Sequence, residues 1–599
     1  MGHRAVGATR TLGSDAPIRA MSSRVLLAAG WPRAGRGDGS VPRHGSTMLQ
    51  LALAVALPAL LLLLLYVVLL RGRFSYWRRR GVPGPPCAAP FGNFADAILG
   101  RKGMADVLCD VYNAHKDQRY VGTQFIVTPL IHLHDPEIIR HVFIKEFPDF
   151  NGRAMYSEPE KDMISGQLFL LSGAPWRNLR VKLSPTFTTG KLRYMFATFK
   201  KCGDQLQQHI RDRVKAGGGH YQEDAKELLA RFGTDIITSV AFGIDANTLA
   251  NPKSEFRRIS GLILDPSISM GMRTMLAFMW PEGLKLFGLT LFPAEANSFF
   301  MRTVQELVDY REKNNVERPD MLSLLIKLKN EGFVPPDAPG QQQADESEVA
   351  VDEPLADLAA EKQKINMKEL AAQCTVFFLA GFETTSSTAT WALYLLAQHQ
   401  DIQDRVVEEM REALEKTGGE LRYDTLMSLP YTDMVLKETM RLYPGVPFLN
   451  REAMRERKLP LTDLVLEKGT RLMIPVLALH KDPKQVSAEQ RVRSPADLLP
   501  SRAHRYWERP EEFDPERFTK EKEEARHPMV YLPFGDGPRI CIGMRMALIQ
   551  VKMALATVLT SVRVSLPADA PATVKLSPFT ITPTPVDPLR LVFSERSAA

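Results

Sequence analysis

Residues 534–543, with the sequence FGDGPRICIG, constrain this chain more than any other segment. They place Cys541 in a glycine-rich loop, and an apolar helical pattern runs from Met544 to Leu555 directly after it. A thiolate at the start of a helix is stabilised by the exposed backbone N–H groups and by the helix dipole. The segment therefore predicts a cysteine whose sulfur can act as a ligand.

The other residues of this loop suit a flat ligand. Gly535, Gly537 and Gly543 let the backbone pass close to such a ligand and adopt positive φ where needed. Arg539 is placed to meet a carboxylate at the ligand's edge. An isolated cysteine is more often buried in an ordinary turn, and only the complete spacing Phe-x-x-Gly-x-Arg-x-Cys-x-Gly reverses that preference.

With this spacing the chain resembles the cytochromes P450, which are haem-thiolate monooxygenases. The resemblance runs from about Pro83 to the C-terminus. It implies a mainly α fold with small β-sheets, here preceded by a transmembrane helix. It also implies haem b, with Cys541 as the axial thiolate and as the protein's ligand to the metal. Phe534, Gly535 and Gly543 would flank the haem.

The resemblance also assigns partners for the haem propionates. Trp176 and Arg180 stand at i and i+4. The indole of Trp176 supplies a neutral N–H donor, and the guanidinium of Arg180 supplies a charged donor that can form two hydrogen bonds. Arg451 and Arg539 match further propionate partners of similar proteins.

An acid and a hydroxyl interrupt the apolar helix expected over residues 371–398. Within AGFETT (residues 380–385), Glu383 and Thr384 would be costly unless they serve a wet, functional groove. The match to the family's oxygen-activation motif assigns Thr384 to the bound dioxygen and Glu383 to the proton path. Both are expected to be catalytic.

Glu438 and Arg441 lie three residues apart on one helical face, a spacing that is most often a surface ion pair. Together with Arg517 in the later sequence PERF, they resemble the family's buried Glu–Arg–Arg cluster, which has a structural role on the proximal side of the haem pocket.

The formal charge of +7 does not indicate nucleic-acid binding, because it is concentrated in two segments. Residues 1–47 hold seven arginines against Asp15 and Asp38, and residues 484–505 hold five basic residues against Glu489 and Asp497. The rest of the chain is nearly neutral. Five irregularly spaced cysteines argue against a disulfide framework or a zinc site.

Residues 48–70 are expected to form a membrane anchor, since 51–70 are apolar apart from Tyr66. Residues 71–90 form a basic, proline-rich connector that would hold that end on the cytosolic side. The pattern resembles microsomal members of the family. It predicts a single-pass anchor in the endoplasmic reticulum membrane and a cytosolic catalytic domain over residues 91–599.

Two segments do not fit the rest of the chain. Residues 1–47 are expected to be a disordered extension, and our hypothesis is that the natural start is Met48; their composition also allows a mitochondrial presequence. Residues 484–505 are expected to be an insertion from a retained intron, with a genuine surface loop as the alternative. Residues 333–363 are expected to be a solvated linker, and short β-rich pieces are expected over residues 120–133 and 471–477.

The sequence contains no G-x-G-x-x-G after a strand and no P-loop, so the electrons are expected to come from another protein. The resemblance implies an NADPH-dependent flavoprotein reductase, with cytochrome b5 as an assisting donor. Residues 153–183 and 235–243 most resemble arthropod members related to the vertebrate drug-metabolising group. That likeness favours O2 insertion into a lipophilic substrate, either a xenobiotic or an endogenous lipid or terpenoid.

By the same resemblance, the pocket walls are expected at residues 151–171, 235–300, 444–450 and 576–582. Two other functions stay open. One is a peroxide isomerase or dehydratase that needs no reductase. The other is a non-catalytic haem-binding membrane protein.

Overall fold

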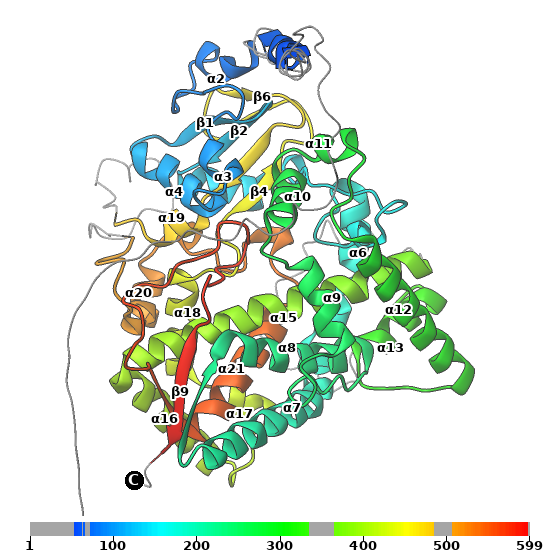
Figure 1. Cartoon of the computed structure of the whole chain (residues 1–599), viewed down its shortest axis with the longest axis vertical. Helices are drawn as coiled ribbons and strands as arrows, with labels where there is room; N and C mark the ends of the chain where they lie inside the picture. The colour runs from blue at the N-terminus through cyan, green and yellow to red at the C-terminus, as the bar shows by residue number, and fades with distance from the viewer. Residues whose placement is uncertain are drawn as a thin grey trace, which may run out of the picture. The chain divides into compact units, whose positions relative to one another are not determined.

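The computed structural model describes residues 53–54, 56–62, 64–65, 72–334, 364–483 and 506–596. The chain forms two units, residues 1–66 and residues 67–599. The described residues of the first unit are helical. The second unit is mostly helical with small sheets, which confirms the predicted fold class (Figure 1).

The α-helices of the second unit vary from single turns to the long central helix α15. They are α2 (Tyr76–Arg79), α3 (Ala95–Ile98), α4 (Met104–Ala114), α5 (Pro136–Arg140), α6 (Gly173–Leu183), α7 (Thr189–Ala216), α8 (Ala225–Phe242), α9 (Glu255–Ile263), α10 (Ile268–Met279), α11 (Pro281–Leu286), α12 (Ala294–Asn314), α13 (Met321–Glu331), α15 (Met367–Gln398), α16 (Gln400–Glu415), α17 (Tyr423–Met427), α18 (Pro430–Leu442), α19 (Val476–His480), α20 (Lys520–Glu524) and α21 (Met544–Leu559).

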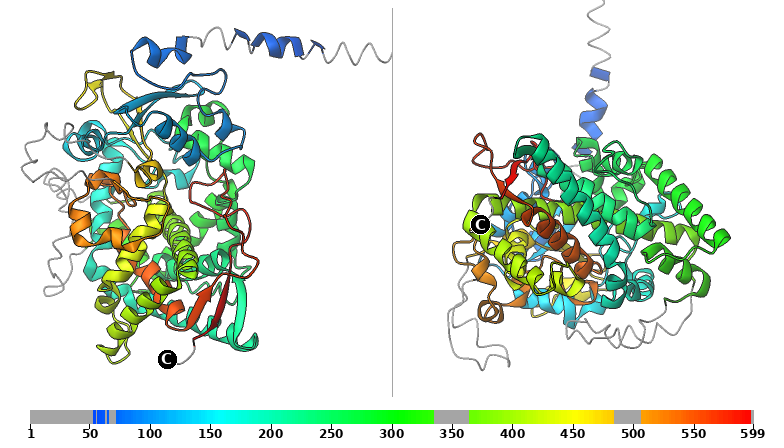
Figure 2. Two further views of the ribbon diagram at one scale, coloured as in Figure 1. Left: turned by 90° about the vertical axis from the view of Figure 1, so that its left-hand side faces the viewer. Right: turned by 90° about the horizontal axis from the view of Figure 1, so that it is seen from below.

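The described strands form three small sheets. The strands are β1 (Tyr120–Phe125), β2 (Thr128–Leu133), β3 (His220–Asp224), β4 (Leu449–Glu452), β5 (Arg457–Lys458), β6 (Val465–Leu466), β7 (Arg471–Ile474), β8 (Val562–Ser565) and β9 (Arg590–Glu595). The largest sheet has the order β1-β2-β7-β4, in which only the β2–β7 pair is parallel. The second has the order β3-β9-β8, and Figure 2 shows β9, in red, near the C-terminus; β5 pairs with β6.

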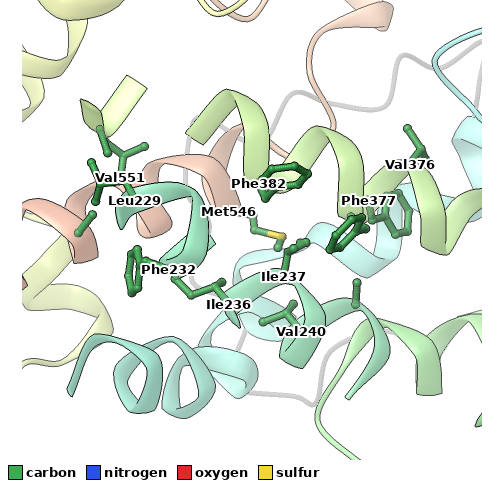
Figure 3. Close-up of a cluster of buried hydrophobic side chains, with 14 of the residues drawn as sticks. Leu229, Phe232, Ile236, Ile237, Val240, Val376, Phe377, Phe382, Met546 and Val551 are labelled. Atoms are coloured by element: carbon green, nitrogen blue, oxygen red, sulfur yellow. The ribbon is translucent and has the colours of Figure 1, made fainter. Parts of the chain in front are cut away.

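Helix α15 crosses the centre of the second unit, and α8, α18 and α21 pack around it (Figure 1). Figure 3 shows the apolar side chains that join α8, α15 and α21, among them Ile237, Phe382 and Met546. The α8–α15 contact is close because Gly381 has no side chain: a Cβ there would lie 2.7 Å from Ile237 Cδ1. Apolar burial therefore fixes the position of α15.

Two predicted element boundaries were wrong. The helix expected from residue 371 begins at Met367, because Asn366 caps it: its side chain accepts the backbone N–H of Glu369, whose carboxylate accepts the N–H of Asn366. The strand expected over residues 471–477 ends at Ile474. Pro475 follows, cannot donate to a β-ladder, and is the N-cap of α19.

Several predicted segments fall wholly or partly outside the described residues. These are residues 1–47, part of the anchor at 48–70, residues 335–363 of the linker and the whole of 484–505. Within the described part of the chain, we find no helix that combines the length and the apolar character needed to cross a membrane.

The structure brings Glu438, Arg441 and Arg517 together in the interior. Arg441 donates to both carboxylate oxygens of Glu438 at 2.7 and 2.8 Å, and Arg517 Nε donates to Oε1 at 3.2 Å. The three side chains are buried, so the ion pairs are shielded from water. They join the end of α18 to the 3₁₀ turn Pro515–Phe518.

His480 extends this cluster towards the cysteine loop. Arg441 Nη1 donates to the carbonyl of His480 at 2.9 Å, and His480 Nε2 accepts the backbone N–H of Leu532 at 2.9 Å. Burial lowers the pKa of His480 to about 3, so the ring is neutral and can accept this bond. The cluster thus connects α18 to the chain that enters the loop at residues 534–543.

We expect Glu438→Ala to lower the free energy of unfolding by about 3–5 kcal/mol, because it leaves two buried guanidinium groups without their carboxylate. The matched control is Glu516→Ala, which removes an exposed ion pair with Arg405 and should cost less than about 1 kcal/mol. Urea unfolding of the full chain measures both. Equal losses of unfolding free energy in the two variants would show that the buried cluster stabilises the fold no more than an exposed ion pair does.

Candidate active site

The loop at residues 534–543 is closed by its own backbone. The N–H of Cys541 donates to the carbonyl of Phe534 at 3.0 Å, and a 3₁₀ turn spans Gly537–Arg539. Gly535 and Gly537 have φ of +73° and +69°, a region that favours glycine. Gly543, by contrast, has an ordinary φ of −93° and serves as the N-cap of α21. Positive φ therefore explains two of the three glycines.

The Cys541 side chain is accessible although it lies deep within the second unit, so it lines a hollow inside the protein. Burial raises the pKa of its thiol and outweighs three opposing influences: a hydrogen bond from the Gly543 backbone and the charges of Arg180 and Arg153. The predicted stabilisation of a thiolate at the helix start is present, but by itself it does not lower the pKa. A cation beside the sulfur would shift the balance.

Four arginines form a cluster that reaches this sulfur through Arg153 and Arg180; its members are Arg153, Arg180, Arg451 and Arg539. Arg153, Arg451 and Arg539 are buried, and Arg180 is half-buried. Burial, followed by repulsion from neighbouring guanidinium groups, lowers the pKa of Arg539 well below its ordinary value. Burial lowers the pKa of Arg153 and of Arg180 to about 10.

These arginines are under-satisfied. Among the residues that the structure describes, none of the four forms an ion pair with a carboxylate, and the buried Nε atoms of Arg153, Arg451 and Arg539 have no hydrogen-bond partner. Buried cations without counter-charge are costly. The cluster therefore fits an anionic ligand edge, such as a pair of propionates.

Aromatic rings hold the guanidinium groups in place. Arg539 lies 4.3 Å from the ring centroid of Trp176 and also donates to the carbonyl of Leu171. Arg451 lies 4.1 Å from the ring of Phe143, and its Nη1 donates to the carbonyl of Asn450 at 2.9 Å. The structure thus brings Trp176, predicted from sequence as a donor, against Arg539.

Helix α15 presents a narrow accessible stripe in a largely buried surface. Ala380, Gly381 and Thr384 lie on this stripe, whereas Phe382 and Glu383 are buried. The hydroxyl of Thr384 donates to the carbonyl of Ala380 at 2.7 Å. The accessible stripe shows that Thr384 lines a groove.

One short segment connects the Thr384 groove to the cysteine loop. A Cβ built on Gly445 would lie 3.8 Å from Thr384 Cβ, and a Cβ on Gly535 would lie 3.6 Å from Leu449 Cδ1. Residues 445–449 thus run from one to the other and continue into β4, which carries Arg451. This segment has contacts at both sides of the site.

The side chains of Glu383 and Thr384 point in different directions, although the two residues are consecutive. Its Oε1 accepts the hydroxyl of Thr582 at 3.0 Å and lies 3.4 Å from Lys226 Nζ. Consecutive helical residues point about 100° apart, so the acid and the hydroxyl of the motif serve different faces of α15.

The roles of three residues of this site were not predicted from the sequence: Arg153, Lys226 and Thr582. Arg153 and Thr582 lie within expected pocket walls, at 151–171 and 576–582, but no contact with the other arginines or with Glu383 was predicted for them. For Arg153, an arginine among apolar residues was the available signal. Lys226 and Thr582 reach Glu383 from distant parts of the chain. Such contacts cannot be predicted from the spacing of neighbouring residues in the sequence.

In the described part of the chain, no three His, Cys, Asp or Glu side chains are grouped so that they could hold a metal ion. A metal bound at Cys541 would therefore need its other ligands from a non-protein group. A porphyrin provides four nitrogens and two propionates, which fits both the single sulfur and the arginine cluster.

Comparison with known proteins agrees with this chemistry. The sequence model of the family described as Cytochrome P450 matches residues 82–487 and 499–589. The chain is 36% identical to cytochrome P450 6a2 of Drosophila melanogaster over 511 residues, which cover 85% of this chain and 93% of the relative. It is 34% identical to cytochrome P450 6k1 of Blattella germanica over 84% of this chain and 90% of the relative. It is 36% identical to cytochrome P450 6A1 of Musca domestica over 90% and 97%. The chain therefore belongs to the cytochrome P450 family, the haem-thiolate monooxygenases that act on a substrate with O2 and electrons from a redox partner.

Proposed function

We propose that this protein is a microsomal monooxygenase that inserts one oxygen atom into a lipophilic substrate, with Cys541 as the haem ligand. The observation that carries the proposal is the accessible sulfur of Cys541 beside four arginines that form no ion pair with a described carboxylate. The substrate would be a xenobiotic or an endogenous lipid or terpenoid. An NADPH-dependent flavoprotein reductase would supply the electrons, with cytochrome b5 as an assisting donor.

Haem b would be held from two directions. The Cys541 sulfur would bind the iron, and Phe534, Gly535 and Gly543 would flank the ring on that side. The propionates would be held by Trp176, Arg180, Arg451 and Arg539, to which the structure adds Arg153 as a further candidate. When bound, the haem supplies the oxygen activation: RH + O2 + 2 e⁻ + 2 H⁺ gives ROH + H2O.

The protein has to deliver the two protons of this reaction. Thr384 exposes a hydroxyl to the groove while it donates to the carbonyl of Ala380. Gly381, one turn away, lets α8 pack closely against α15, since a Cβ there would lie 2.7 Å from Ile237 Cδ1. We assign Thr384 to hold a proton and water beside the reacting oxygen, and Glu383 to the path that resupplies it.

A small apolar cleft, of about 40 Å³, supports an apolar lining for the substrate site. It is lined by Met272, Met275 and Phe278 of α10, by Phe448 and by Phe579. These side chains come from three of the four segments expected to form pocket walls. Methionine and phenylalanine make an adaptable apolar lining.

The electron source is inferred from the sequence. The chain carries no motif for a flavin or a nicotinamide cofactor, so a separate reductase has to bind both.

We also propose that residues 48–70 anchor the protein in the endoplasmic reticulum membrane with the catalytic domain in the cytosol. The apolar run at 51–70 and the arginines that follow it support this orientation. Large apolar residues are exposed on the second unit at Ile268 in α10, at Leu286 in α11 and at Phe287 just after α11. Such residues would suit a membrane surface. Release of the full chain from membranes by alkaline carbonate would contradict the anchor.

The remaining segment assignments are proposals too. The family match omits residues 488–498, which lie inside the suspected insertion at 484–505, and it begins only at residue 82. The gap supports the view that the central part of 484–505 is foreign to the catalytic domain (91–599). That translation starts at Met48 is a separate proposal, which rests on the composition of residues 1–47. Abundant native peptides from residues 2–44, or transcripts that retain the insertion in most messages, would contradict these views. Residues 71–90 and 333–363 would act as connector and linker.

The function is tested by product formation from a panel of lipophilic compounds under ¹⁸O2. We expect product with one ¹⁸O atom, and we expect it only with NADPH and the reductase present. Rearrangement of an added fatty hydroperoxide without O2 uptake would instead indicate an isomerase or dehydratase. Haem binding without any product would indicate a non-catalytic haem protein.

We expect Arg539→Leu to weaken haem binding by about 10- to 100-fold, the effect of losing one hydrogen bond to a charged group. The same change removes a repelled buried cation, so the haem-free protein should not lose stability. Haem titration and thermal unfolding of the haem-free chain measure the two effects. Arg405→Leu, which removes an exposed ion pair, is the control. Unchanged haem affinity in Arg539→Leu would contradict the propionate assignment.

We expect Phe579→Ala to weaken the binding of large lipophilic substrates by about tenfold, because a substrate loses an aromatic wall. The ring of Phe579 packs against the backbone at Gly100 and Gly271, so its place in the cleft is fixed. Spectral binding titrations measure the change, and Tyr310→Ala, exposed on α12, is the control. Equal affinities in wild type and Phe579→Ala would remove this cleft from the substrate site.

A further inference from the structure

Glu383 is held on the side of α15 that faces away from the accessible stripe with Thr384. Its side chain is only 11% exposed. Both of its polar side-chain contacts fall on one oxygen: the Thr582 hydroxyl donates to Oε1 at 3.0 Å, and Lys226 Nζ lies 3.4 Å from the same atom. Among the described residues, no protein group donates to Oε2.

Lys226 reaches this carboxylate from the first turn of α8. Its ammonium also donates to the hydroxyl of Thr584 at 3.1 Å, and that hydroxyl lies 3.3 Å from Thr582 Oγ1. The ammonium, the two hydroxyls and the carboxylate thus form one closed polar group. It joins α8, α15 and the loop that carries Thr582 and Thr584.

The loop is fixed independently of Glu383. Trp391 Nε1, two turns further along α15, donates to the carbonyl of Pro583 at 2.9 Å. The Trp391 ring in turn stacks on Tyr443, with ring centroids 3.8 Å apart. Thr582 is therefore presented to Glu383 by a rigid support.

The ion pair is not needed to hold the helices together. Apolar side chains such as Ile237 and Phe382 already pack α8 against α15, with close approach at Gly381 (Figure 3). A nearly buried carboxylate, however, is unfavourable unless a cation and hydrogen-bond donors accompany it. The contacts therefore act on Glu383 itself.

We infer that Lys226, with Thr582, positions the catalytic acid of this enzyme: together they hold Oε1 of Glu383 in place and leave Oε2 for proton transfer towards the Thr384 groove. This inference rests on the proposed role of Glu383 in the proton path. Lys226 and Thr582 are positioning residues, since they act through Glu383. They contact neither the groove nor the cysteine loop in the structure.

The test compares Lys226→Met with Lys226→Arg, which keeps the charge, in the full-length haem-loaded chain. We expect Lys226→Met to lower the rate of product formation about tenfold, to divert electrons to hydrogen peroxide and to increase the solvent isotope effect. Lys226→Arg should restore most of the coupling. Lys201→Met is the matched control. Lys201 lies on the neighbouring helix α7 and makes an exposed ion pair with Asp245.

A double-mutant cycle separates positioning from general damage. In the Glu383→Gln background, Lys226→Met should have almost no further effect, since its target is gone. Infrared difference spectra give a readout apart from turnover: Lys226→Met should shift a carboxylate band, and that band should be missing when Glu383→Gln is added. Thr582→Val, with Thr582→Ser as its hydroxyl-keeping control, provides a second variant if Lys226→Met folds poorly.

Two results overturn the inference and are distinguishable. If Glu383→Gln is impaired but Lys226→Met and Thr582→Val match the Lys201→Met control, Lys226 and Thr582 do not position the acid, and the proposed role of Glu383 stands. If Glu383→Gln itself couples normally, the proton role of Glu383 fails, and the inference fails with it.

Discussion

The packing of four guanidinium groups beside one accessible sulfur is the constraint on which the rest of this structure depends. Three of these arginines are buried, and they repel one another while none of them forms an ion pair with a described carboxylate. Buried cations of this kind are costly, and a bound anion would offset the cost. Haem would meet this need at its edge through the propionates and at its centre through the iron–sulfur bond. The family relationship shown by the sequence comparisons and the local physical chemistry therefore lead to the same cofactor.

Helix α15 links this cofactor site to the proton supply. Its position comes from apolar packing against α8 and α21, while the direction of its polar groups comes from a few contacts made by distant segments. Thr384 faces the groove and Glu383 faces Lys226 and Thr582. The separation lets one helix expose the Thr384 hydroxyl on one face and hold the Glu383 carboxylate among polar protein groups on another.

Much of the site could be predicted from the sequence, because its motifs are local. The loop at residues 534–543, the Glu383–Thr384 pair and the Glu438–Arg441 pair are each set by a spacing of a few residues. The contacts of Arg153 and Lys226 could not be predicted in this way, because tertiary folding alone brings these residues to their partners. The same holds for the hydrogen bond that the Leu532 N–H donates to His480. Two predicted element boundaries were wrong because local signals override the apolar pattern. The capping pair Asn366 and Glu369 sets the start of α15, and Pro475 ends the strand before α19.

The central claim is that the sulfur of Cys541 binds the haem iron, and the optical spectrum of the reduced carbon-monoxide complex tests it most directly. The full chain is expected to show the absorption band typical of thiolate-bound haem, and Cys541→Ser is expected to lose that band even where it still retains haem. Cys202→Ser, which alters a buried cysteine remote from the loop in sequence, should leave the band in place. A thiolate-type spectrum that survives unchanged in Cys541→Ser would contradict the account.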